Sequence, residues 1–103
     1  MYKIKYLDGA KKNLSEIEKF LDNIDRRLTD KILTEIEKRV SELQEMPLRY
    51  PKYVDNPDYR NTGVKKYVIF YKVDEVKKIV EIHRILHSAQ NIELEMLKST
   101  LTK

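Results

Sequence analysis

The sequence contains no cysteine, no tryptophan, only 2 glycines and only 2 histidines among its 103 residues. Without cysteine the chain forms no disulfide and offers no thiolate to a metal ion, which is usual for proteins of a reducing compartment. Two histidines are too few for a typical protein-only zinc site. We therefore expect neither a metal nor a cofactor.

Long hydrophobic runs are also missing. No stretch approaches the ~18 consecutive apolar residues that a membrane-spanning helix requires. Residues 1–7 contain two lysines and no extended apolar segment, so they do not resemble a secretion signal. These absences predict a cytoplasmic protein that has no contact with a membrane.

Charge, in contrast, is abundant. Charged residues make up 37% of the chain and hydrophobic residues 41%, as in soluble globular proteins. The 21 Lys and Arg exceed the 17 Asp and Glu and give a formal net charge of +4. Such an excess suits an acidic or polyanionic partner, although many small domains carry it without binding nucleic acid. The length predicts one domain, over residues 1–103, with one small core.

The spacing of apolar residues predicts a strand followed by two helices. Residues 2–6 alternate between apolar and charged side chains, as in a half-buried strand. Apolar residues then recur every three or four positions over residues 10–24 and again over residues 28–46, as in amphipathic helices. Asn23 and Asp25 offer short polar side chains for a turn or a cap before the second helix, and the short connection predicts an antiparallel helical hairpin.

The second half of the chain is rich in β-forming residues. Residues 47–59 contain all 3 prolines and predict an ordered loop. Two strands over residues 67–73 and 79–86 are joined by a charged connection and predict a hairpin. Asn91 can cap a short C-terminal helix over residues 91–97. Together these elements predict an α+β fold in which an N-terminal strand and a helical hairpin pack on a small antiparallel sheet.

Two segments of this β-rich half carry a family likeness. Residues 67–73 read Tyr-Val-Ile-Phe-Tyr-Lys-Val, and residues 80–87 read Val-Glu-Ile-His-Arg-Ile-Leu-His. With Arg60 ahead of them, and over nearly its whole length, the chain resembles the RelE/ParE toxin superfamily, especially the ParE-like plasmid stabilisation branch. The resemblance implies a toxin of a bacterial type II toxin–antitoxin system, neutralised by an antitoxin that wraps the helices and the sheet.

The resemblance implies different targets for the two branches. ParE-like members poison DNA gyrase without chemistry of their own, and this is the function that we expect. RelE-like members cleave messenger RNA in the ribosome; in that alternative Arg60, Arg84 and His87 would be catalytic. The residues after His87 include no Arg, His or Tyr where RelE-like nucleases place theirs.

A third alternative is a homologue that binds an antitoxin but is not toxic. ParE-like chains usually end this motif in His-Gly-Ala-Arg-Asp, whereas residues 87–91 read His-Ser-Ala-Gln-Asn. Ser88 and Gln90 therefore replace a glycine and an arginine of the family pattern.

The basic residues of the second half are the candidates for target binding, namely Lys65, Lys66, Arg60 and Arg84. Cations beside tyrosines suit phosphate contact and base stacking, but lysines also protect edge strands from aggregation. The resemblance implies that apolar residues of the helices meet the antitoxin, and the candidates are Leu14, Ile17, Leu28 and Ile32.

Strict alternation along the last strand predicts which side chains are buried. It places Arg84 on one apolar face with Ile82 and Leu86, where a charged side chain needs a partner. That partner is either a carboxylate within the fold or a group of the target. The same alternation places His83 on the opposite, solvent-facing side.

Overall fold

The computed structural model describes residues 1–92 and 94–96, which form five strands and two long helices followed by a C-terminal helical segment. The elements in chain order are β1 (Lys3–Tyr6), α1 (Asp8–Asp22), α2 (Arg26–Glu42), β2 (Lys52–Tyr53), β3 (Asn56–Val64), β4 (Tyr67–Asp74) and β5 (Ile79–His87). The sheet has the order β1-β5-β4-β3-β2, with β1 parallel to β5 and all other pairs antiparallel. This is the α+β fold that the sequence predicts. No helix in this described part is long and apolar enough to cross a membrane.

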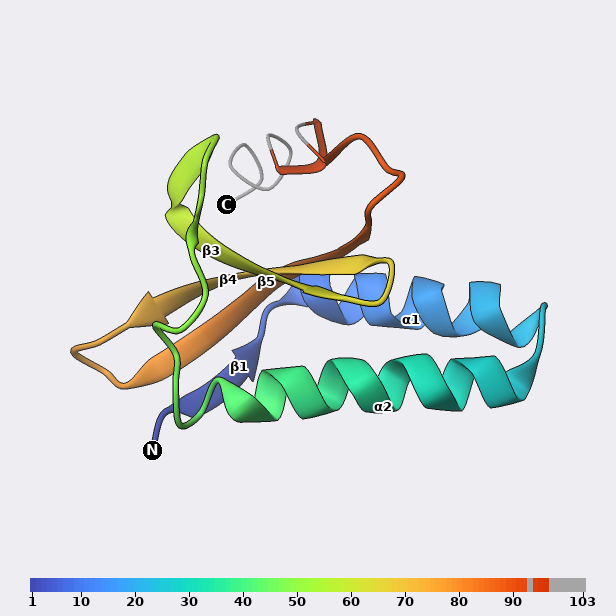
Figure 1. Ribbon diagram of the computed structural model, residues 1–103, viewed down its shortest axis with the longest axis horizontal. Helices are drawn as coiled ribbons and strands as arrows, with labels where there is room; N and C mark the ends of the chain where they lie inside the picture. Colours follow the sequence, from blue (N-terminus) through green and yellow to red (C-terminus); the bar gives the residue numbers. More distant parts are fainter. Residues whose placement is uncertain (93, 97–103) are drawn as a thin grey trace.

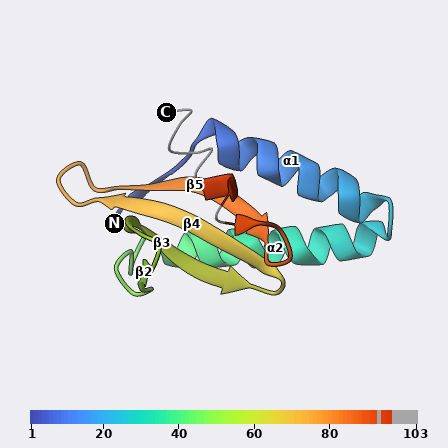
Figure 2. The ribbon, with the colours of Figure 1, turned by 90° about the horizontal axis from the view of Figure 1, so that it is seen from above.

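The helical hairpin covers one face of the sheet, with α1 and α2 side by side (Figures 1 and 2). Of the two candidates, Asp25 caps α2, because its carboxylate accepts a hydrogen bond from the Arg27 backbone N–H at 2.9 Å, whereas Asn23 lies at the C-terminal end of α1. The side-chain and backbone hydrogen bonds from Arg27 lower the pKa of Asp25. Thr29 of α2 is also buried. The buried apolar residues of the two helices all lie on their predicted stripes: Ala10, Ile17, Leu21, Ile32, Ile36 and Val40.

The core has two parts, one on each face of the sheet. The larger cluster lies between the helices and the sheet and includes Ile69, Tyr71 and Ile82. The smaller one lies on the opposite face around Tyr59, Phe70, Leu86 and Met96. The C-terminal segment therefore packs on the second face of the sheet. Its predicted cap is confirmed by a hydrogen bond from the Leu94 N–H to the Asn91 side chain at 3.1 Å; the end of the predicted helix, at residue 97, lies outside the described residues.

The predicted loop over residues 47–59 is partly wrong, because β2 and the start of β3 lie within it. These two strands pair with each other through Lys52 opposite Arg60. Tyr53 anchors the short strand by packing edge-on against Phe70, with ring centroids 5.0 Å apart. Pro51 precedes β2, and Pro57 lies near the start of β3, before its pairing with β4 begins at Arg60, so neither proline interrupts that pairing.

A β-bulge in β5 overturns the predicted alternation. Phe70 pairs with Arg84 and the next residue of β4, Tyr71, pairs with Ile82, so His83 is an extra residue in β5. The prediction that Arg84 shares a face with Ile82 is therefore wrong. The prediction that His83 faces solvent is also wrong, because its side chain is buried at 6% exposure against the Tyr59 ring.

Candidate functional site

The helical hairpin extends past the turn between β3 and β4 (Figures 1 and 2). A groove lies there between the helices and the turn. This groove, here called the tip groove, has a cavity volume of about 590 Å³. Residues of both helices, the turn and the end of β5 line it: Phe20, Leu21, Ile24, Leu28, Lys31, Ile32, Lys65, Lys66, Tyr67 and His87. A hollow of about 360 Å³ adjoins it and adds Ile17 and Glu16 from α1 and Gln90.

The tip groove combines an apolar floor with a cationic rim. Leu21, Ile32 and Tyr67 are buried in its floor, and burial raises the pKa of the Tyr67 hydroxyl. Phe20 and Ile24 remain 60% and 59% exposed, which is unusual for large apolar side chains so close together. The cations are Lys31 of α2 and the two lysines of the β3–β4 turn.

Hydrogen bonds on both sides hold the β3–β4 turn beside the helices. Arg39 of α2 donates to the Gly63 carbonyl at 2.8 Å, and the Ser88 N–H donates to the Lys66 carbonyl at 2.8 Å. Within the turn, Lys65 has a φ of 55°, in the left-handed region that glycine and asparagine adopt at lower cost. The fold therefore places a lysine where its backbone is strained.

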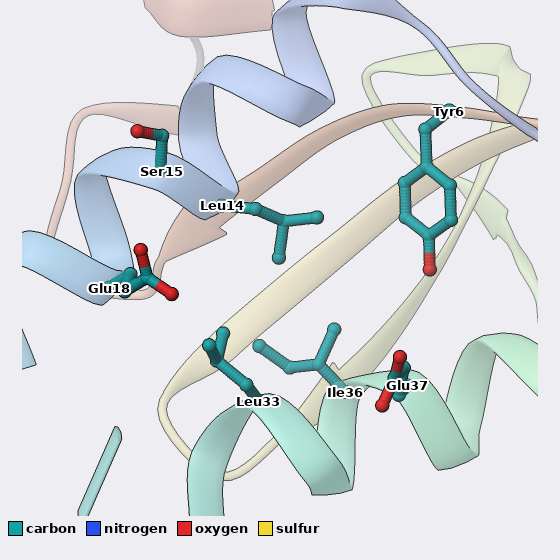
Figure 3. A pocket seen from close by; sticks show the side chains of 7 residues that line it. All are labelled: Tyr6, Leu14, Ser15, Glu18, Leu33, Ile36 and Glu37. Atoms are coloured by element: carbon teal, nitrogen blue, oxygen red, sulfur yellow. The ribbon is translucent and has the colours of Figure 1, made fainter. Parts of the chain in front are cut away.

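A second groove runs between the two helices and carries the opposite charge. This interhelical groove has a volume of about 420 Å³, and Figure 3 shows Leu14 and Leu33 facing each other across it. Glu18 of α1 and Glu37 of α2 flank these aliphatic groups, and the Tyr6 hydroxyl points toward α2 (Figure 3). Burial, and then the negative charge of Glu37, raise the pKa of Tyr6.

The candidate binding residues from the sequence gather largely in one place. The proposed antitoxin contacts Leu28 and Ile32 line the tip groove together with the proposed target contacts Lys65 and Lys66. Ile17 lines the adjoining hollow, and Leu14 alone lies in the interhelical groove.

Arg60 is engaged by the loop that precedes β2. Its Nη1 donates to the Tyr50 carbonyl at 2.7 Å and, at 3.5 Å, to the Leu48 carbonyl. Its cross-strand neighbour Tyr71 donates from the hydroxyl to the Pro47 carbonyl at 3.2 Å. Burial raises the pKa of Tyr71 to about 12, and the charge of Arg60 partly opposes that rise. Arg60 and Tyr71 thus tie the loop to the sheet.

Arg84 lies against the first turn of α1. Its Nη1 donates to the His83 carbonyl at 2.8 Å, and its guanidinium occupies the space that a side chain at Gly9 would fill. Nearby, the Asn13 side chain accepts a hydrogen bond from the Ile85 N–H at 3.0 Å, where β1 no longer covers the edge of β5. Within residues 1–92 and 94–96, the hydrogen bond that the structure shows for Arg84 goes to a backbone carbonyl.

His87 closes the end of β5. Its Nδ1 accepts a hydrogen bond from the Ala89 N–H at 3.0 Å, and its backbone N–H donates to the Gln90 side chain at 2.7 Å. The ring packs edge-on against Tyr67, with centroids 5.2 Å apart. Gln90, one of the two departures from the family pattern, thus supports the backbone of His87.

The three candidate catalytic residues do not converge. Side chains of residues paired across antiparallel strands lie on the same face of the sheet. Arg60 pairs with Tyr71 and therefore lies on the face that the helices cover, whereas Arg84 pairs with Phe70 and leaves the strand on the opposite face. His87 pairs with Tyr67, which is four positions from Tyr71 and thus about 13 Å away along β4. No group of three or more acidic or histidine side chains that could hold a metal occurs in residues 1–92 and 94–96.

Sequence reasoning missed Phe20, Ile24 and Lys31 as site residues. Ile24 was assigned to the apolar stripe of the first helix, whereas the structure leaves it on the groove rim. The available signal was Phe20, a large aromatic residue that lies outside the three-and-four spacing of that helix.

Comparisons with known proteins agree on one family. Residues 4–92 match the sequence model of the ParE toxin of the type II toxin–antitoxin system ParDE. A search of curated protein sequences gives no match.

Among solved structures, the fold is similar to that of a chain of the chromosomal ParDE system from P. aeruginosa, with a TM-score of 0.70 and 19% identity over 84% of this chain and 96% of that one. It is also similar to a chain of the RelBE2 toxin–antitoxin complex from Mycobacterium tuberculosis, with a TM-score of 0.64 and 20% identity over 84% and 96%. A chain of the intact E. coli RelBE complex gives a TM-score of 0.62 and 16% identity over 87% and 100%. At these identities the structural likeness concerns the fold, while the sequence match covers most of the chain, which thus belongs to the ParE toxin family of type II toxin–antitoxin systems.

Proposed function

We propose that this chain is a cytoplasmic toxin that inhibits DNA gyrase and is neutralised by a cognate antitoxin. The observation that carries the proposal is the match of residues 4–92 to ParE toxins. The site supports it, because the described surface offers binding grooves while Arg60, Arg84 and His87 lie apart and are each engaged within the fold.

The mechanism of such a toxin is differential binding. A protein that binds one state of the gyrase cycle more tightly than the others shifts the enzyme toward that state without chemistry of its own. Lys65 and Lys66, which line the tip groove at the β3–β4 turn, are the proposed contacts. Arg60 and Arg84, the other two candidates, engage the loop before β2 and the first turn of α1 instead.

The antitoxin is the partner that the relatives' complexes suggest. Leu28, Ile32 and Ile17 offer it apolar contacts in and beside the tip groove, and Leu14 offers one in the interhelical groove. Only Leu14 and Leu28 of these four are partly exposed, so the other two contribute mainly to the core.

The test is a supercoiling assay with purified gyrase, ATP, relaxed plasmid and increasing amounts of the toxin. We expect inhibition and linear plasmid from trapped breaks, and at least a roughly tenfold loss of potency when Lys65 and Lys66 are both replaced by Ser, because about 1.4 kcal/mol of binding energy corresponds to tenfold. Lys77→Ser, in the β4–β5 turn, is the matched control. Folded protein that leaves gyrase untouched would rule out this target.

A second candidate function is ribosome-dependent cleavage of messenger RNA, which the fold similarity to the RelBE complexes favours. Primer extension on translating ribosomes tests it. Cleavage that disappears in His87→Ala and Arg60→Ala variants of unchanged circular dichroism would establish a nuclease. A third outcome is a chain that binds its antitoxin but neither arrests growth, nor inhibits gyrase, nor cleaves messenger RNA on ribosomes. Such a chain would be a non-toxic homologue.

A further inference from the structure

Arg39, in the last turn of α2, connects this helix to two other segments through one guanidinium. Its Nη1 donates to the Thr62 hydroxyl at 2.5 Å and to the Gly63 carbonyl at 2.8 Å, both near the end of β3. The guanidinium also lies over the Tyr50 ring, 5.2 Å from its centroid, and its Nε lies 3.7 Å from the Glu42 carboxylate. These contacts engage the side chain within the fold and leave it 30% exposed.

The β3–β4 turn, which follows these residues, needs support from outside. Val64 and Tyr67 pair across it, so Lys65 and Lys66 are its two turn residues. Lys65 has a φ of 55°, in the left-handed region where a side chain is strained. A residue other than glycine keeps such a backbone only where the surrounding structure enforces it. The turn is therefore expected to relax into other conformations when its supports are removed.

The two turns that flank β4 are supported in different ways. In the β4–β5 turn, where Lys78 has a φ of 59°, the Asp74 side chain accepts hydrogen bonds from two backbone N–H groups of the turn at 2.9 and 3.1 Å. The support there is local. The β3–β4 turn is instead held by groups from distant parts of the chain, Arg39 on one side and the Ser88 N–H on the other.

We propose that Arg39 is a positioning residue for target binding, which holds the β3–β4 turn in the conformation that presents Lys65 and Lys66 to gyrase. The inference rests on the proposed function and adds a residue that acts through the turn. Arg39 itself is not among the described residues that line the tip groove. If the turn adopts its competent conformation for only a fraction of the time, the apparent affinity falls by that fraction. Loss of the Arg39 contacts should therefore weaken binding although both lysines remain.

The role requires a guanidinium, and a positive charge alone does not fill it. The planar fork of N–H donors bonds two oxygens while its face lies on the Tyr50 ring, whereas the ammonium group of a lysine is a compact point charge. Arg39→Lys therefore keeps the formal charge of +4 and removes the arrangement. The matched control is Arg27→Lys on the same helix, because Arg27 is 93% exposed and pairs with Asp25.

The first experiment measures amide hydrogen exchange without any target. The Ser88 amide reports on the β3–β4 turn because it donates to the Lys66 carbonyl, and the Lys3 amide reports on the other turn because it donates to the Lys78 carbonyl. In Arg39→Lys we expect the Ser88 amide to exchange about tenfold faster, as for the loss of one hydrogen bond to a charged group, and the Lys3 amide to be unchanged. Equal acceleration of both amides, or of neither, would overturn the inference.

The second experiment measures the potency of the toxin in the gyrase supercoiling assay. We expect about a tenfold loss in Arg39→Lys and wild-type potency in Arg27→Lys. Ile36→Val, in the buried core of the same helix, separates positioning from stability, because it should lower the Tm and leave the potency unchanged. Wild-type potency in Arg39→Lys, or an equal loss in Ile36→Val, would overturn the inference and leave the proposed function standing.

The hydroxyl of Thr62 provides a test of the contact itself. Thr62→Val removes one acceptor of Arg39, whereas Thr62→Ser keeps it and should retain wild-type potency. Because the two residues act through one contact, the combination of Arg39→Lys with Thr62→Val should lose less potency than the two separate losses multiplied. Fully independent losses would contradict the contact. A wild-type toxin that leaves gyrase untouched would overturn the proposed function, and the exchange experiment would still decide whether Arg39 holds the turn.

Discussion

Gly9 is the residue on which the position of Arg84 depends. The Arg84 guanidinium fills the space beside the Gly9 Cα, so the methyl group of Gly9→Ala would displace it. Without that contact, replacing a helical glycine by alanine would raise the free energy of unfolding by up to about 1 kcal/mol. Because that guanidinium is the end of a flexible side chain, it can move aside at little cost, so we expect the free energy of unfolding in urea to change by less than about 1 kcal/mol. Gly63→Ala, whose added methyl meets only ordinary contact at 3.9 Å, is the control; a loss of more than about 2 kcal/mol in Gly9→Ala would show that Arg84 cannot move aside.

Tyr71 makes the fold sensitive to alkali. Its hydroxyl bonds the Pro47 carbonyl, and its pKa is raised from 10.0 to about 12. The neutral form is favoured by folding, so this contribution is fully present below pH 10 and is lost as the pH rises through about 12. Tyr71→Phe should cost about 1 kcal/mol at neutral pH and should lose less stability than wild type between pH 9 and pH 11.5 in thermal denaturation. Parallel losses in both proteins would show that other groups account for the alkaline sensitivity.

The sequence could identify Arg60, Arg84 and His87 but not their contacts. Charged residues on apolar strands stand out in any reading of the pattern. The hydrogen bonds shown for their side chains, however, include those to backbone groups of Tyr50, His83 and Ala89, which carry no signal in the residue types. For these three positions the functional assignment stays a prediction.

At the scale of elements, periodicity made the helices and long strands predictable and failed where pairing is not local. The extra residue at His83 reverses the faces of β5 after Ile82, and no glycine or proline in residues 79–87 marks the bulge. Strand β2 forms because the tertiary fold brings residues 52–53 beside β3, against the loop preference of the neighbouring prolines. Tertiary pairing therefore overrode local preference at both places.

Asp25 controls the start of α2. Replacing it by Ala removes the acceptor for the Arg27 N–H, so we expect a lower Tm at neutral pH. Because hydrogen bonds lower the pKa of Asp25 in the folded state, its contribution is present above pH 3.8 and is lost as the pH falls. The difference in Tm between Asp25→Ala and wild type should therefore shrink toward pH 2. Asp30→Ala, on the exposed face of the same helix, is the control; an undiminished difference at pH 2 would show that the carboxylate charge is irrelevant.

The whole molecule separates its charges in a way that the net value hides. The chain has a formal charge of +4, yet the interhelical groove is acidic and the tip groove is basic. Composition predicted the basic excess, and order of elements predicted the fold. The tip groove escaped prediction because it lies between α1, α2, the β3–β4 turn and the end of β5, which are distant in the sequence.

If the lysines of the tip groove attract gyrase locally, the affinity for gyrase should depend on salt in a way that the net charge of the chain alone does not predict. Lys66→Ser and Lys77→Ser both lower the formal charge from +4 to +3, but only Lys66 lines the groove. Raising the salt from 0.05 to 0.2 M should weaken binding of wild-type toxin to immobilised gyrase, because the screening length falls to about 7 Å. We expect Lys66→Ser to bind more weakly at low salt with a shallower salt dependence, and Lys77→Ser to follow wild type. If both variants flatten the dependence equally, long-range attraction by the total charge governs binding, and the groove lysines have no special part in it.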